Sequence, residues 1–226
     1  MKKSETKRRW VAIALFYVIA VLTRALALKY QDLNTGTFVV WLWHWARGIG
    51  PCLGAIVVVL ALKREFYCTI TGTSVWKSAV SVLLPFAICF FIDRGLSFTL
   101  LGFIFYSFLE EVGWRGYLQG ELKDMNPFLR VLIIGMMWFF WHISIGFNIG
   151  SLIFLVILLF GTWGIGCIAR DTKSLVACAC FHTLVNFSNQ SGISFSPIVI
   201  ALYVLVIACW FLIWYVPWEN IRLRKG

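Results

Sequence analysis

The chain has 226 residues, of which 61% are hydrophobic and only 13% are charged, and its formal net charge is +10. A soluble domain carries roughly 25% charged residues, and one core of this length could not bury so much apolar surface. The composition therefore excludes a soluble globular protein. It indicates a single integral membrane domain over residues 1–226.

Apolar segments follow one another along the whole chain, and each predicts a membrane-spanning helix. They cover residues 10–28, 38–62, 76–92, 96–114, 129–146, 150–168, 174–187 and 195–217. The seventh is shorter than the roughly 20 residues of a span, so its helix either is little tilted or runs past its apparent end. Asn126 suits an N-cap and Pro127 a first helical position, which places the start of the fifth helix near Pro127. The predicted fold class is an all-α, polytopic transmembrane bundle of about eight helices.

Basic residues are distributed unevenly between the two ends of these spans. With the N-terminus inside, the outer segments hold only Lys29 and Arg94, and Arg24, Arg47 and Arg115 fall within or at the edge of apolar segments. The inner segments hold all the others: Lys2, Lys3, Lys7, Arg8, Arg9, Lys63, Arg64, Lys77, Lys123, Arg130, Arg170, Lys173, Arg222, Arg224 and Lys225. By the positive-inside rule, this bias predicts that both termini are cytoplasmic.

The net charge is thus interpreted as a sign of orientation and of contact with anionic lipid of the inner leaflet. No nucleic-acid partner is predicted, because the sequence has no basic patch interleaved with aromatic residues on a soluble surface. The sequence does not predict an oligomeric state.

Two adjacent carboxylates, Glu110 and Glu111, close the apolar run that begins at Leu96. A charged side chain at membrane depth costs about 2.5–3.5 kcal/mol, so this pair is either compensated or functional. Arg115 lies four residues after Glu111 on the same helical face and can pair with it. Glu110 points about 100° away and has no local partner, as a general base requires. The alternative is a paired cluster that only marks the cytoplasmic end of the helix.

Two histidines lie in other apolar segments, His142 in WFFWHISIG and His182 in ACFHTLVN. Asn186 shares a helical face with His182. Either histidine alone could join helices by a hydrogen bond. Together with the acidic pair, they are expected to converge on one polar cavity, because separate burial would be costly. His44, in WLWHWARG, is interpreted instead as an interfacial residue without a catalytic role.

Several kinds of chemistry could use this set. A carboxylate and an imidazole can activate water to attack a peptide carbonyl, while a second imidazole and an amide stabilise the oxyanion. Alternatively, Glu110, His142 and His182 bind a divalent metal such as zinc. The sequence has no HExxH motif and no recognisable serine nucleophile elbow. A proton-coupled transporter and a non-catalytic scaffold or immunity protein remain alternatives, since Glu and His chains also relay protons.

Three motifs, in this order, resemble those of the CAAX protease and bacteriocin-processing family, also called CPBP or Abi. EEVGWRGYL matches its EExxxR motif, the stretch ending in His142 resembles FxxxH, and His182 to Asn186 matches HxxxN. Trp138 stands where the family usually has Phe, and we interpret it as keeping an aromatic packing role. The motifs define a predicted catalytic core over residues 97–187.

The resemblance implies an intramembrane endopeptidase, of glutamic or metallo type, that acts on a membrane-associated peptide or protein. It implies that Glu110 activates water with His142 beside it, and that the HxxxN pair stabilises the oxyanion. Glu111 and Arg115 are expected to hold the helix and orient the site. The small chain resembles bacterial members, which implies the bacterial plasma membrane and a role in peptide maturation or bacteriocin self-immunity.

Straight helices would not bring Glu110 level with His142. Glu110 lies near the inner end of its segment, whereas His142 lies about 13 residues, roughly 20 Å, from the start of its own. We therefore expect the fourth helix to break or end near Glu110, or the fifth to start below the membrane surface. A cavity open to the cytoplasm would admit water to such a site.

Overall fold

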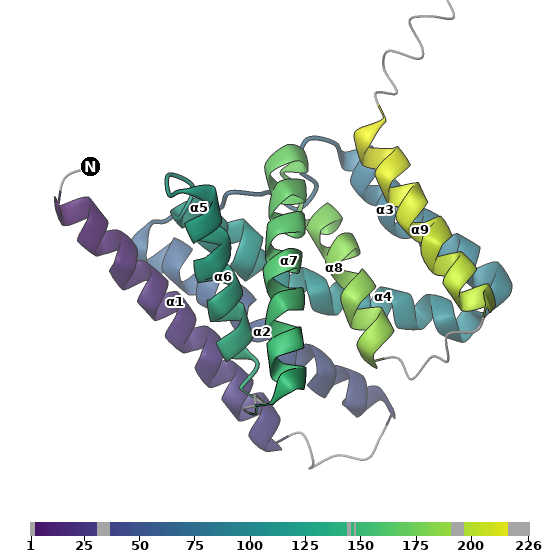
Figure 1. Ribbon diagram of the computed structural model, residues 1–226, viewed down its shortest axis with the longest axis horizontal. Coiled ribbons are helices and arrows are strands. Elements are labelled where there is room, and N and C mark those ends of the chain that lie inside the picture. Colours follow the sequence, from purple (N-terminus) through teal and green to yellow (C-terminus); the bar gives the residue numbers. More distant parts are fainter. Residues whose placement is uncertain (1–2, 31–36, 144–145, 147, 191–196, 217–226) are drawn as a thin grey trace, which may run out of the picture.

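The computed structural model describes residues 3–30, 37–143, 146, 148–190 and 197–216, and no β-strand occurs among them. Figure 1 shows how the helices are arranged. Their bounds are α1 (Lys3–Tyr30), α2 (Thr37–Leu62), α3 (Val75–Ile92), α4 (Arg94–Glu111), the π-helix η2 (Val112–Leu118), α5 (Gln119–Glu121), α6 (Pro127–Trp141), α7 (Ile149–Thr172), α8 (Leu175–Gln190) and α9 (Pro197–Tyr215). The predicted all-α class is confirmed.

Every predicted apolar segment contains a helix. Within the described residues, five helical stretches are long and apolar enough to cross a membrane, and α6, α8 and α9 supply shorter apolar helices. The chain is therefore a multi-pass membrane protein. The short seventh segment is extended, since α8 continues to Gln190.

Helix α6 begins where the sequence predicts and ends earlier. The Asn126 side chain accepts hydrogen bonds from the backbone N–H groups of Phe128 and Leu129, with Pro127 at the first helical position. The helix ends at Trp141 instead of reaching residue 146. Ile143 has a φ of 64°, in the left-handed region that terminates α-helices, so the chain turns away just after His142.

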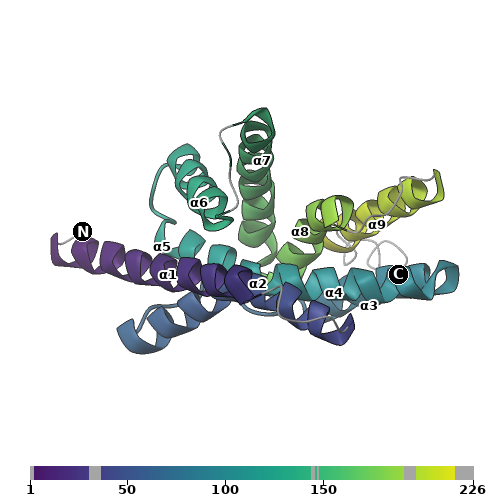
Figure 2. The same cartoon turned by 90° about the horizontal axis from the view of Figure 1, so that it is seen from below.

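The helices form two layers, with α1 to α4 in one and α6 to α9 in the other (Figure 2). Helix α4 packs against α2 in its own layer and against α8 in the other. It runs across α7 and α8 instead of parallel to them (Figure 1). This crossing brings the C-terminal end of α4 to the middle of the molecule, where the second layer covers it.

Small residues let α1 and α2 approach closely. A Cβ added at Gly50 would lie 2.6 Å from the backbone oxygen of Ala20, and one added at Gly54 would lie 2.6 Å from that of Phe16. Glycines four residues apart are typical of such close helix contacts in membranes. The contact fixes α1 beside α2 and so carries Arg24 into the interior.

Ion pairs join the start of α1 to the segments that follow α2 and α5. Arg9 pairs with Asp124 at 3.1 Å, and Glu5 pairs at 3.1 Å with Arg64, which also pairs with Glu121 at 2.6 Å. These segments therefore lie at one end of the bundle. They include seven of the basic residues that the sequence places inside, whereas Lys2, Arg222, Arg224 and Lys225 lie outside the described residues.

This arrangement leads to a test of the predicted orientation. Lys123 and Arg94 are both exposed; Lys123 lies between α5 and α6, Arg94 is the first residue of α4, and the predicted topology places them on opposite sides. We expect a membrane-impermeant maleimide to label Lys123→Cys only from the cytoplasmic side and Arg94→Cys only from the opposite side. The wild-type protein, with seven free cysteines, gives the background. Labelling of both positions from the same side would contradict the alternating topology.

Candidate active site

Helix α4 changes its geometry directly after the acidic pair. The following π-helix, Val112–Leu118, is buried along its whole length, and the N–H of Gln119 bonds the carbonyl of Trp114. A Cβ added at Gly113 would lie 2.4 Å from Cβ of Pro51, so the π-helix packs directly on α2. The break expected near Glu110 is thus present. Such π segments are frequent at functional sites because they displace side chains from the regular helical register.

Glu110 is held by a residue of α6. Its carboxylate is only 1% exposed, and its Oε2 accepts a hydrogen bond of 2.8 Å from Nε1 of Trp138. The carbonyl of the same tryptophan lies 2.8 Å from Nδ1 of His142. A carbonyl only accepts, so Nδ1 carries the hydrogen, and Nε2 of the neutral ring is left as an acceptor. Trp138 therefore connects the carboxylate to an imidazole that can take a proton.

Glu111 serves a separate network. Nη1 of Arg115 donates to its Oε1 at 3.1 Å, forming the pair expected from their spacing. Nδ1 of His182, on α8, lies 2.8 Å from the same oxygen. All three side chains are almost completely buried. Because a buried carboxylate is costly without partners, Glu111 ties η2 to α8.

The HxxxN pair lies on one face of α8, as its spacing predicts. Nδ2 of Asn186 is 3.2 Å from Nε2 of His182 and donates to Oγ of Ser107 at 3.1 Å. The hydroxyl of Thr183 also donates to Ser107, at 3.1 Å. Ser107 thus fixes the amide of Asn186 against α4, beside the ring of His182.

The structure brings the three motifs together around Trp138. Its ring meets His182 edge-on at 4.8 Å between centroids, and the guanidinium of Arg115 lies 4.7 Å from the ring centre. Electrostatic interactions also link His142 to Glu110 and His182. The aromatic packing role expected of Trp138 is present, and its N–H also holds Glu110. This second role could have been expected, since the N–H of a buried tryptophan usually finds a hydrogen-bond acceptor.

The interfacial interpretation of His44 was also wrong. The residue is 9% exposed, and its ring stacks against Tyr106 on α4 with centroids 4.5 Å apart. Nδ1 of His44 lies 3.0 Å from Nη2 of Arg47, one turn along α2. Tyr106 precedes Glu110 by one helical turn, so α2 supports the part of α4 that carries the carboxylate.

The donor atoms do not fit a bound metal. Among the residues that the structure describes, no group of three or more His, Cys, Asp or Glu side chains could hold one. Nε2 of His182 contacts the amide of Asn186, and Nδ1 lies 2.8 Å from the carboxylate of Glu111. The set of Glu110, His142 and His182 considered from the sequence is therefore not arranged as three ligands.

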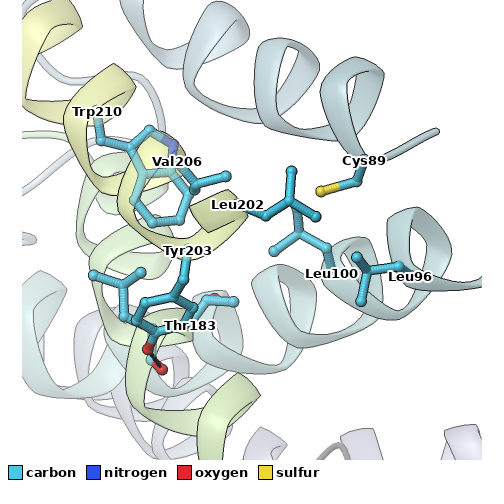
Figure 3. A pocket seen from close by; sticks show the side chains of 9 residues that line it. Cys89, Leu96, Leu100, Thr183, Leu202, Tyr203, Val206 and Trp210 are labelled. Atoms are coloured by element: carbon cyan, nitrogen blue, oxygen red, sulfur yellow. Dashed lines mark hydrogen bonds between the residues drawn. The ribbon is translucent and has the colours of Figure 1, made fainter. Parts of the chain in front are cut away.

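Two cavities of the molecule differ in polarity. A polar cavity of about 520 Å³ at the charged end is bordered by Arg9, Arg64 and Glu121. A small apolar cavity of about 30 Å³ lies between α3, α4, α8 and α9 (Figure 3). Neither is lined by Glu110 or His142. The partly exposed members of the site, His142 and Asn186, lie toward the C-terminal ends of α6 and α8, away from the charged end.

The fold and site define a multi-pass helical membrane protein with a buried glutamate, two histidines and an asparagine. Residues 93–188 match the family described as "Type II CAAX prenyl endopeptidase Rce1-like". This match coincides with the core predicted from the motifs and confirms the resemblance to the CAAX protease family.

Curated relatives point in the same direction. The chain is 23% identical to the lysostaphin resistance protein A of Staphylococcus haemolyticus, with 87% of this chain and 64% of the relative covered. It is 24% identical to the protein of the same name from Staphylococcus epidermidis, with 87% and 61% covered. The chain thus spans about three fifths of the length of these relatives.

The role of Trp138 can be tested with the aromatic residue usual in the family. Trp138→Phe keeps a ring near His182 and Arg115 but removes the donor to Glu110. Since a hydrogen bond to a charged group contributes about 1.5–3 kcal/mol, we expect kcat for the peptide hydrolysis proposed below to fall by roughly tenfold to a hundredfold. Trp163→Phe, at an exposed position of α7, serves as the control and should keep wild-type kcat. Equal kcat values for the two variants would contradict this role.

Proposed function

We propose that this protein is an intramembrane peptidase that hydrolyses peptide bonds of membrane-associated peptides or proteins. The observation that carries the proposal is the pairing of two groups around Trp138: the buried carboxylate of Glu110, held by the indole N–H, and the imidazole of His142, which has a free acceptor nitrogen and interacts electrostatically with Glu110. A carboxylate and an imidazole in this relation are suited to remove a proton from water. The similarity to a family of membrane endopeptidases supports the same reaction.

The proposed reaction assigns a step to each group. Glu110, assisted by His142, takes a proton from water as the hydroxide attacks the carbonyl carbon. The HxxxN pair stabilises the oxyanion of the tetrahedral intermediate. The C–N bond then breaks, and Glu110 returns the proton to the leaving nitrogen. Glu111 and Arg115 keep η2 and α8 in place during these steps.

Water and substrate must reach a site that is largely closed. We propose that they enter at the side of His142 and Asn186, because these are its partly exposed members.

We also propose a location and a biological role. The protein acts in a bacterial plasma membrane, where it matures secreted peptides or protects against a bacteriocin. The Staphylococcus relatives, which are named for resistance to lysostaphin, support a protective role.

Cleavage by the purified protein tests this function directly. The protein in lipid nanodiscs is incubated with a library of membrane-associated peptides in H₂¹⁸O, and products are identified by mass spectrometry. We expect new carboxyl termini that contain ¹⁸O in wild type and none in His142→Ala. Folded wild type without any product would favour a scaffold or immunity protein, and solute flux in proteoliposomes without product would favour a transporter.

A chelator distinguishes the glutamic from the metallo mechanism. The ring nitrogens of His182 lie against Glu111 and Asn186 and not toward a common metal position. We therefore expect EDTA to leave the cleavage rate of wild type unchanged. A rate that falls with EDTA and returns with added zinc would contradict the metal-free mechanism, while the peptidase function itself would stand.

A further inference from the structure

A cluster outside the three motifs joins the first helix to Glu110. Arg24 on α1 is 9% exposed, although it lies within a stretch apolar enough to span a membrane. Its Nη1 lies 3.0 Å from the carbonyl oxygen of Arg47 and 3.4 Å from the hydroxyl of Tyr106. Its guanidinium also lies 4.6 Å from the ring centre of Trp141, the neighbour of His142.

The charge of Arg24 needs compensation. A guanidinium buried at membrane depth is costly unless an anion or several acceptors balance it. Among the ion pairs formed by described residues, none includes Arg24. Arg24 instead contacts Tyr106, which lies four residues before Glu110 on α4.

Tyr106 is suited to connect the two charges. It is 3% exposed and lies four residues before Glu110, on the same face of α4. An arginine only donates, so the oxygen of Tyr106 accepts from Arg24 and its hydrogen is left to donate. Tyr106 also interacts electrostatically with Glu110, one helical turn further along α4. A path therefore runs from Arg24 through Tyr106 to Glu110.

Helix α2 fixes the ring of Tyr106 in this position. His44 stacks on one part of it, at 4.5 Å between centroids. At Gly48, an added Cβ would lie 2.7 Å from Cε2 of the ring, so the tyrosine occupies the space that a side chain would need. Arg24, His44 and Gly48 all lie outside residues 93–188, the part of the chain that matches the family.

We propose that Arg24 and Tyr106 are positioning residues for Glu110. The inference rests on the proposed peptidase function. Tyr106 donates to the carboxylate, Arg24 holds the tyrosine hydroxyl and supplies a positive charge one side chain away, and α2 clamps the ring. Glu110 is thereby held in the orientation in which it takes a proton from water. The first two helices thus act on the site without touching the substrate.

Kinetics of four variants in nanodiscs test this path: Arg24→Gln, Tyr106→Phe, their double variant and Arg24→Lys. A carboxylate held less firmly should lower kcat by roughly tenfold to a hundredfold, with KM changed less than about twofold. If both residues act through one path, kcat of the double variant should be no lower than kcat of the more impaired single variant. Arg24→Lys should recover part of kcat, and Arg94→Gln, at an exposed position, should match wild type.

Thermal unfolding of each variant shows whether it is folded. Wild-type kcat in folded Tyr106→Phe, or losses that multiply in the double variant, would overturn the proposal. A purely structural role would lower the unfolding temperature without the separation of kcat from KM. Gly48→Ala provides an independent variant, expected to resemble Tyr106→Phe because it displaces the same ring.

A second measurement keeps this inference separate from the proposed function. The rate at which dicyclohexylcarbodiimide modifies Glu110 is followed by mass spectrometry, which needs no cleavable substrate. We expect modification to be several-fold faster in Arg24→Gln and Tyr106→Phe, because the carboxylate loses a donor that covers it. If wild type cleaves no peptide but these rates differ, the peptidase proposal fails and the path stands. Equal rates in all variants would overturn the path.

Discussion

Replacing Glu110 by glutamine is expected to abolish peptide cleavage. The amide keeps the size of the carboxylate and an oxygen that can accept from Trp138, but it cannot take a proton from water. General base catalysis contributes roughly 10²–10⁴-fold, and we therefore expect kcat to fall by at least about a hundredfold with the fold intact. Product formation by wild type and variant in the same nanodiscs measures this effect.

A matched carboxylate serves as the control for this prediction. Glu65 is exposed at the charged end, so Glu65→Gln changes the net charge equally without affecting the site. It should retain wild-type kcat. Substantial cleavage by Glu110→Gln would remove Glu110 as the base and transfer the role to another group, of which His142 is the nearest candidate in the hydrogen-bonded chain.

Replacing Arg115 by leucine is expected to produce the largest loss of stability. Arg115 and Glu111 are both completely buried, and the leucine would leave the carboxylate with only His182 beside it. Removing one partner of a buried ion pair costs about 3–5 kcal/mol. Unfolding in detergent, followed by tryptophan fluorescence against temperature or denaturant, would report this loss.

Two further variants separate burial from charge. Arg170 pairs with Asp171 at 2.8 Å, but its side chain is 60% exposed. Arg170→Leu should therefore cost no more than about 1 kcal/mol. The double variant Glu111→Gln with Arg115→Leu should be more stable than Arg115→Leu alone, because it removes the unpaired charge. If Arg115→Leu and Arg170→Leu destabilise equally, burial does not determine the strength of the Arg115 pair.

The sequence by itself determined the class of protein, the helices and the candidate residues. The surplus of apolar residues required a bilayer, and segment length set the number of helices. The spacing of Glu111 and Arg115, and of His182 and Asn186, placed each pair on one helical face, because a helix has a fixed period. Asn126 and Pro127 located the start of α6 because cap residues act locally. The end of α6 was misplaced, since apolar character alone does not define where a helix stops.

Only the tertiary structure decided how the separate motifs meet. The crossing of α4 over the second layer and its π-helix place Glu110 beside Trp138, and neither feature has a period that the sequence reveals. The partners of Trp138, His44, Tyr106 and Arg24 cannot be identified from the sequence, because an aromatic or basic residue in an apolar segment has many possible partners. Their partners lie on helices far away along the chain; Arg24 and Tyr106, for example, are 82 residues apart. Such contacts depend on which faces of distant helices pack together, and helix packing, not local sequence, fixes that choice.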